Sequence, residues 1–266
     1  MTMARDITFG TESAGAAAWR RLRSFGSTWG GIAVIALIWE LAGRIAGQFW
    51  LPPFSTVIAR LWELLTDGSL TPHLLASLGS LTLGFSIALA IGLVVGFLMG
   101  VFTWVNSALD VYVNAMMFTP GLIFAPILFA IFGLGFATRV SVVVIYAVFI
   151  IIINTAAAVR NVDRPLLEMA AGYGASRWTA LIRIVLPDAF PLILAGIRMG
   201  VGRAVKGMVN GEMFIALIGI GGQAARFGKQ FDFTSVWALS VFIMIIAVAI
   251  NQGVSHLERR MTSWVE

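Results

Sequence analysis

Cysteine is absent from the 266 residues of this chain, and charged residues make up only 12% of it. The lack of cysteine excludes disulfides, iron–sulfur clusters and thiolate metal sites. Soluble domains carry about 25% charged residues, whereas this chain is 59% apolar and has a mean hydropathy of +0.92. The composition is that of a membrane protein.

Histidine and lysine are nearly as rare. The two histidines, His73 and His256, lie far apart in the sequence and read as surface or helix-end residues rather than a metal site. Neither Lys206 nor Lys229 is followed by Ser or Thr, so the chain has no P-loop for ATP. No carboxylate pair and no Ser/His/Asp set has a spacing that suggests catalysis. The sequence therefore predicts a protein that is not an enzyme, with no metal or cofactor of its own.

Apolar stretches long enough to cross a bilayer recur along the chain. They predict an all-α polytopic protein with a single transmembrane domain at 29–255, flanked by tails at 1–28 and 256–266. The six expected spans are residues 29–48, 75–103, 109–135, 139–159, 188–210 and 234–255.

Three stretches are expected to depart from a simple series of straight membrane-spanning helices. Pro120 and Pro126 are expected to kink the third span, because proline removes a helical hydrogen bond. The amphipathic stretch 57–65 is too short to cross and is expected to lie at the membrane interface. The glycine-rich section 211–222 reads as a re-entrant or interfacial turn.

The second span carries a stripe of small residues at every fourth position, which lets a neighbouring helix approach backbone to backbone. Its members are Gly84, Ala88, Gly92, Gly96 and Gly100. The stripe predicts tight helix packing and no chemistry.

The basic residues indicate which side of the membrane each loop faces. Six spans place both termini and the loop 160–187 on one side, which holds ten of the 18 Lys and Arg residues; the other side holds five, and three lie in the fifth span. Cytoplasmic loops are enriched in Lys and Arg, so this loop and both termini are expected in the cytoplasm. Because the basic residues are dispersed between apolar spans, the net charge of +5 does not indicate a nucleic-acid partner.

The loop 160–187 is patterned as two short helices joined by a bend. Asp163 and Ser176 are suited to cap the two helices. Gly172 and Gly174 suit the bend, because glycine adopts positive φ without strain. Pro187 is expected to end the second helix before the fifth span begins.

This loop resembles the "EAA" loop of the permeases of ABC importers, the binding-protein-dependent inner-membrane components. The family pattern of Glu-x-Ala, Gly and Leu-Pro falls on Glu168, Ala170, Gly174, Leu186 and Pro187. The residue after Glu168 is Met169, where the familiar pattern has Ala. Four further stretches resemble the nitrate, sulfonate and taurine branch of the family: residues 51–57, 161–163, 174–176 and 196–204.

The resemblance implies a MetI-like ABC permease fold in a bacterial inner membrane. Such a permease works as two copies, here a homodimer, with two cytoplasmic ATPase subunits that bind ATP and Mg and an external substrate-binding protein. The residues implied in coupling to the ATPase are Glu168, Ala170, Ala171, Gly174, Leu186 and Pro187. The alternative is an ordinary loop with a capped helix.

The fifth span contains cations that lipid does not tolerate well. Each Lys or Arg costs about 2.5–3.5 kcal/mol at mid-depth on insertion scales. At 100° per residue Arg203, Lys206 and Asn210 fall within about 60° of one another, so this face is expected to meet protein or water. It suits an anion such as a sulfonate, nitrate or carboxylate. The candidate pathway residues are Arg198, Arg203, Lys206, Asn210 and Glu212.

Two alternatives remain open at this stage. The cations can instead pair with Glu40 or Glu212 and simply hold helices together. An ion-coupled secondary transporter would use the same two carboxylates as relays inside the membrane. A structural membrane scaffold is a third possibility, but it leaves the cations of the fifth span unexplained.

Overall fold

The computed structural model describes residues 30–45, 47, 50–215 and 218–261, and every regular element within them is a helix. The all-α prediction is confirmed for this part of the chain. The predicted tail at 1–28 and residues 262–266 lie outside it. The chain divides into two units, residues 1–59 and 60–266, which are described separately.

In the first unit, residues 30–45 form a helix within the predicted first span. Glu40 is bound locally: its carboxylate accepts hydrogen bonds from Arg44 Nε at 2.6 Å and from the Ser55 backbone N–H at 2.8 Å. The indole of Trp39 donates to the carbonyl of Pro52 at 3.1 Å. Glu40 is therefore bound by Arg44, four residues later in the same helix, and by Ser55 at the start of α2 (Phe54–Thr66).

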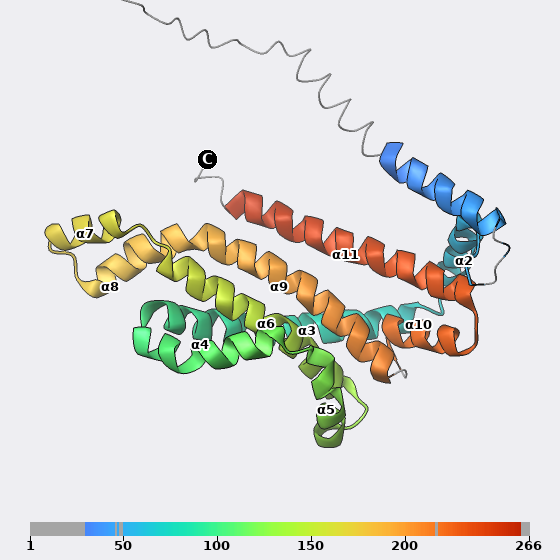
Figure 1. Cartoon of the computed structure of the whole chain (residues 1–266), viewed down its shortest axis with the longest axis horizontal. Coiled ribbons are helices and arrows are strands. Elements are labelled where there is room, and N and C mark those ends of the chain that lie inside the picture. Colours follow the sequence, from blue (N-terminus) through green and yellow to red (C-terminus); the bar gives the residue numbers. More distant parts are fainter. Residues whose placement is uncertain (1–29, 46, 48–49, 216–217, 262–266) are drawn as a thin grey trace, which may run out of the picture. The chain divides into compact units, whose positions relative to one another are not determined.

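Three long helices form the core of the second unit: α3 (Thr71–Val101), α6 (Phe136–Arg160) and α9 (Leu186–Ile215). α6 packs along both α3 and α9 (Figure 1). The small-residue stripe of α3 lies against α6. A Cβ atom added at Gly92 would come within 2.6 Å of Ile151, and one added at Gly96 within 2.6 Å of the Ile152 carbonyl. At these two positions the helices therefore meet at a distance that only glycine permits.

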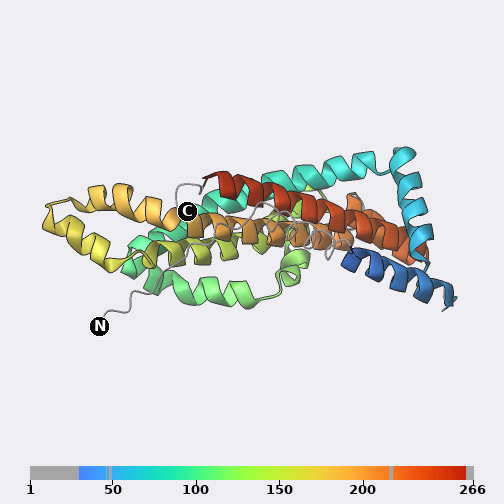
Figure 2. The same cartoon turned by 90° about the horizontal axis from the view of Figure 1, so that it is seen from above.

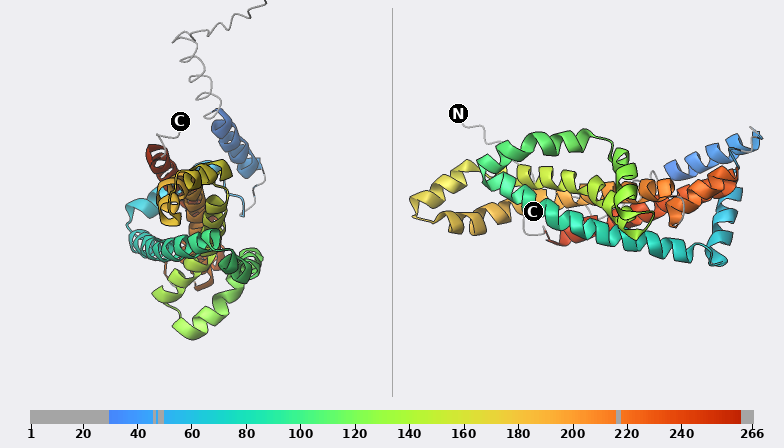
Figure 3. Two further views of the ribbon diagram at one scale, coloured as in Figure 1. Left: turned by 90° about the vertical axis from the view of Figure 1, so that its left-hand side faces the viewer. Right: turned by 90° about the horizontal axis from the view of Figure 1, so that it is seen from below.

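The predicted third span is not one helix. α4 (Thr103–Phe118) is followed by a 3-10 turn, η1 (Gly121–Phe124), and α5 (Ala125–Phe132), with a bend of 96° between them (Figures 1 and 3). The break falls at Thr119, whose ψ of 129° is extended, as expected for a residue before proline. Pro126 does not kink a helix, because it lies in the first turn of α5, where its missing N–H costs nothing.

The expectation that Pro187 ends a helix is wrong. α8 (Arg177–Ala180), a π-helical turn η2 (Leu181–Val185) and α9 form one helical run from Arg177 to Phe214. The N–H of Leu186 bonds to the carbonyl of Leu181, five residues back. This wide turn directly precedes Pro187, where an ordinary helix would lack a donor.

The last helices are α10 (Ile220–Lys229) and α11 (Phe233–Met261). α9 runs to Ile215 and α10 begins at Ile220, so most of the glycine-rich section is helical, and α11 continues past the predicted end of its span. Among the described residues, four helical segments are long and apolar enough to cross a membrane, or five when the bent α4–α5 pair counts as one. The helix at 30–45 has only 16 described residues.

Candidate coupling loop and cation face

The loop 160–187 projects from one end of the second unit as α7 (Arg164–Gly172) followed by α8 (Figure 2). Its bend is a Schellman motif, in which the Ala175 N–H bonds to the Ala170 carbonyl at 2.9 Å and the Gly174 N–H to the Ala171 carbonyl at 3.0 Å. Gly174 has a φ of +75°, which costs an L-residue energy and glycine none. The bend therefore depends on Gly174.

The two predicted caps differ in the structure. The Ser176 hydroxyl accepts the Thr179 N–H at 3.2 Å and pairs with the Thr179 hydroxyl at 2.8 Å, so α8 is capped as predicted. Asp163 precedes α7, but its side chain makes no capping hydrogen bond. Pro165 in the first turn has no N–H that needs a partner.

The predicted coupling residues fall into two groups. Glu168, Ala171 and Gly174 are exposed on α7 and its bend, and Ala170 is buried. Leu186 and Pro187 lie in the first turn of α9, beyond η2, so they are not part of the projecting tip.

The loop also exposes large apolar side chains that the sequence analysis did not single out. Tyr173 is 88% exposed, Trp178 is 72% exposed and Met169 is 55% exposed. An exposed group of this kind on a projecting segment is typical of an interaction site. The sequence did contain a sign of this exposure, because Tyr173 lies between Gly172 and Gly174, in a bend where it is not expected to pack into the core.

The three cations of α9 are all exposed but have different surroundings. Arg198 Nη1 lies 3.2 Å from Glu258 Oε2 of α11. Within the described part of the chain, Arg203 and Lys206 have no ion pair or hydrogen bond. The Asn210 amide donates to the Tyr146 hydroxyl at 3.2 Å. Within the described part of the second unit, none of the three cations pairs with Glu212.

A cavity of about 210 Å³ adjoins Arg203. It lies between the end of α4, the turn η1, the middle of α6 and α9, next to the 96° bend. Among the described residues that line it, Arg203 is the one with a charge, and Thr119 and Tyr146 have polar side chains.

Glu212 is fully buried in a separate polar cluster. Its carboxylate accepts hydrogen bonds from the Ser77 hydroxyl at 2.8 Å and the Gly221 N–H at 3.1 Å, and lies 4.0 Å from Arg139 Nη1. The Ile220 N–H bonds to Ser77 Oγ at 3.0 Å. Side chains of α3 and α9 thus cap the first N–H groups of α10, which has no cap of its own.

His73 completes this cluster. Its Nδ1 accepts the Gly219 N–H at 3.2 Å, and its Nε2 contacts the Gln223 amide. Within the described residues no three ligand-type side chains are placed to hold a metal ion. The structure therefore separates Glu212 from Arg203 and Lys206 and surrounds it with helix-joining contacts.

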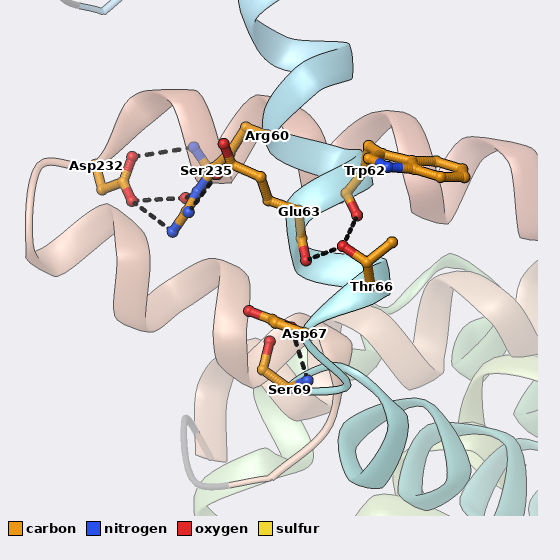
Figure 4. Close-up of polar contacts among 8 residues, drawn as sticks. All are labelled: Arg60, Trp62, Glu63, Thr66, Asp67, Ser69, Asp232 and Ser235. Carbon is orange, nitrogen blue, oxygen red and sulfur yellow. Dashed lines mark hydrogen bonds and ion pairs between the residues drawn. The ribbon is translucent and has the colours of Figure 1, made fainter.

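At the same end of the unit, Arg60 joins α2 to the start of α11 (Figure 4). Its Nε donates to Ser235 Oγ at 2.9 Å and its Nη1 to Glu63 at 2.9 Å. Asp232 caps α11 by accepting the Ser235 N–H at 3.1 Å. Nearby, the Ser69 N–H holds the pKa of Asp67 below its ordinary value.

Comparison with known proteins gives the family. Residues 88–263 match the family described as "Binding-protein-dependent transport system inner membrane component". The chain belongs to this family. It is a multi-pass permease subunit of an ABC transporter.

Relatives and solved structures agree with this assignment. The permease is 30% identical over 235 residues to a riboflavin transport system permease of Chloroflexus aurantiacus, with 88% of each chain covered. It is 28% identical over 242 residues to the taurine transport system permease of Escherichia coli K12, again with 88% of each covered. A structure of the MetNI methionine ABC transporter in an inward-facing conformation has a TM-score of 0.64 and 18% identity, over 72% of this permease and 95% of that chain. The last likeness shows the MetI-like fold alone.

The residues that the sequence analysis missed in this permease are Tyr146, Arg139 and Ser77. Tyr146 contacts residues of η1 and α9, and Arg139 and Ser77 contact Glu212. Each of these contacts joins residues far apart in the sequence. No local pattern marks such pairs.

Proposed function

We propose that this permease is one half of an ATP-driven importer, and that the loop 160–187 docks with an ATPase subunit. The observation that carries the proposal is the projecting Schellman bend with Met169, Tyr173 and Trp178 exposed around it. Glu168, exposed on the same helix, can pair with a cation of the partner. The chain has no P-loop, so ATP and Mg would bind to the separate ATPase subunit.

The rest of the assembly follows from this role. The loop and both termini would face the cytoplasm of a bacterial cell, in accord with the positive-inside rule. Two copies of the permease would form a homodimer, and an external substrate-binding protein would deliver the solute. ATP binding would move the loops of the two copies and rock the spans between two orientations.

We propose that the solute is a small anion, such as a sulfonate, nitrate or carboxylate. Arg203 and Lys206 lie exposed in a spanning helix, and neither has a partner in the described part of the chain. Such residues face the bundle interior or a water-filled path rather than lipid. One relative is named for transport of taurine, a zwitterion that has a sulfonate group at one end, and another is named for riboflavin transport.

An ion-coupled carrier is not favoured. Glu40 is held by Arg44 and Ser55, and Glu212 is enclosed by Ser77, Gly221 and Arg139. A relay carboxylate has to exchange protons or ions with a path across the membrane, and Glu212 has no exposed surface.

Co-purification with the candidate ATPase tests the docking proposal. We expect the wild type and Gly172→Ala to retain the ATPase, because Gly172 is helical and has open space around it. Gly174→Pro should lose it, since proline removes the N–H that bonds to Ala171 and cannot adopt φ of +75°. Glu168→Lys should also lose it. Retention by both folded variants would contradict the proposal.

A further inference from the structure

Tyr146 lies in the middle of α6 and is held by three elements. A Cβ atom at Gly121 of η1 would come within 2.7 Å of the Tyr146 ring, and one at Gly207 of α9 within 2.7 Å of its Cβ. The ring therefore fits between two glycines. Its hydroxyl accepts the Asn210 amide at 3.2 Å, so the position of the hydroxyl is fixed as well.

The direction of this hydrogen bond determines what the hydroxyl can offer. A phenol oxygen both accepts and donates. Because Asn210 donates through Nδ2, the proton of Tyr146 remains free to donate to another group. The Arg203 guanidinium, in the same cavity, offers only donors. The polar wall formed by these two side chains thus presents donors.

The helix break beside the cavity makes no hydrogen bond to Arg203 within the described residues. The Thr119 hydroxyl donates to the Ala115 carbonyl at 2.8 Å, and the Pro120 carbonyl accepts the Ile123 N–H at 3.0 Å. Irregular backbone at membrane depth occurs where it is buried in protein or lines a water-filled cavity. The break therefore shapes the cavity, and Arg203 has no ion pair within the described residues.

The size and the remaining walls limit the ligand. The volume of about 210 Å³ equals about seven water molecules at 30 Å³ each. Met116, Met117, Ile145 and Phe149 provide apolar walls. A compact molecule with one anionic end and a short apolar body matches both the donors and these walls.

We propose that this cavity is a binding site for a small organic sulfonate or carboxylate. Arg203 and Tyr146 bind the anionic end, and Asn210 positions the Tyr146 hydroxyl. The inference rests on the proposed function, since it places a transit site on the cation face of the importer. It adds that the permease itself selects the solute, in addition to any external binding protein.

The test measures binding to the purified complex of permease and ATPase, in the absence of a binding protein. The probes are radiolabelled ethanesulfonate and propionate, with ethanesulfonamide and propionamide as uncharged competitors of similar size. We expect saturable binding of at least one anion, displaced by the unlabelled anion and not by its amide. Arg203→Gln should weaken this binding at least tenfold and Tyr146→Phe several-fold. Lys229→Gln removes an exposed cation of α10 outside the cavity. It should change the binding affinity by less than twofold.

The possible failures are distinguishable. If the ATPase co-purifies but neither anion binds, or if Arg203→Gln binds as the wild type does, the inference is overturned and the importer assignment stands. If Lys229→Gln weakens binding as much as Arg203→Gln, binding follows net charge and the cavity is not the site. If the ATPase does not co-purify with the wild type, the proposed function itself fails.

Discussion

At the scale of single residues, a few positions in this permease are fixed by backbone or burial rather than by side-chain chemistry. Gly174 takes a conformation that other residues resist, and Glu212 is an acid without exposed surface. The two positions have opposite requirements for a side chain. Gly174 requires the absence of a side chain, and Glu212 requires one that accepts hydrogen bonds.

Gly174→Ala should loosen the bend of the loop without a steric clash. A left-handed conformation costs an L-residue about 1–2 kcal/mol, and no atom lies within 4 Å of the added Cβ. We expect amide hydrogen exchange of residues 174 and 175 to accelerate about tenfold, since 1.4 kcal/mol equals a factor of ten. Gly172→Ala is the matched control, because Gly172 has no positive φ. Equal exchange in the two variants would show that the bend does not depend on Gly174.

Glu212→Ala should destabilise the permease strongly. It leaves the Ser77 hydroxyl, the Gly221 N–H and the Arg139 guanidinium without an acceptor in a buried site. Removal of one partner of a buried ion pair costs about 3–5 kcal/mol, which should appear as a large loss of thermal stability in detergent. Glu212→Gln should lose less, because the amide keeps one acceptor. Glu168 is exposed, so Glu168→Ala should change the free energy of unfolding by less than about 0.5 kcal/mol. An equal loss of stability from Glu212→Ala and Glu168→Ala would contradict this prediction.

At the scale of elements, the sequence predicted the helices and the two-helix loop but not how some of them join. Periodic apolar runs and capping residues are local signals, so α2, α3, α6 and the Ser176 cap could be predicted. The 96° bend after α4 and the passage of the chain through Pro187 could not. Proline permits a kink, a break or a helix start, and packing decides among them.

In the candidate site, too, local patterns could be predicted from the sequence and long-range contacts could not. The cation face of α9 could be predicted, because Arg203, Lys206 and Asn210 share one side of a helix at 100° per residue. The Tyr146 contact and the Arg139–Glu212 pair could not, since each joins residues more than 60 positions apart. The expected grouping of Glu212 with the cations failed for the same reason.

The α3–α6 contact offers a prediction at the scale of elements. Gly96→Ala would place a Cβ 2.6 Å from the Ile152 carbonyl and 2.7 Å from Thr155 Cβ, and overpacking of this kind costs about 1–3 kcal/mol. We expect a lower thermal unfolding midpoint in detergent. Gly79→Ala, on the same helix but 3.8 Å from its nearest neighbour, should be neutral or slightly stabilising. A harmless Gly96→Ala would show that the helices do not touch there.

At the scale of the whole molecule, this permease would be one half of a larger transporter. The permease supplies the spans, the projecting loop that is proposed to dock with the ATPase, and a face of cations, whereas energy and solute delivery would come from other chains. Because the sequence contains no cysteine, single cysteines can be introduced into the otherwise natural permease.

Cysteine cross-linking should detect the second copy. Met199 is 53% exposed on α9, and at 100° per residue it lies within about 40° of Arg203. If the cation faces of two copies meet, Met199→Cys should give a dimer with a short bismaleimide in native membranes. Met244→Cys, 59% exposed on α11, should remain monomeric. The reverse pattern would place the homodimer contact on α11.

The central claim, that the loop 160–187 couples the permease to an ATPase, is tested most directly by photo-cross-linking from the loop tip. Met169→Cys and Tyr173→Cys would each carry a benzophenone maleimide, with Lys229→Cys on α10 as the control. We expect ATPase adducts from both loop positions, with yields that change when ATP is bound, and none from position 229. Adducts from position 229 alone, or from none of the three in a complex that still transports, would contradict it.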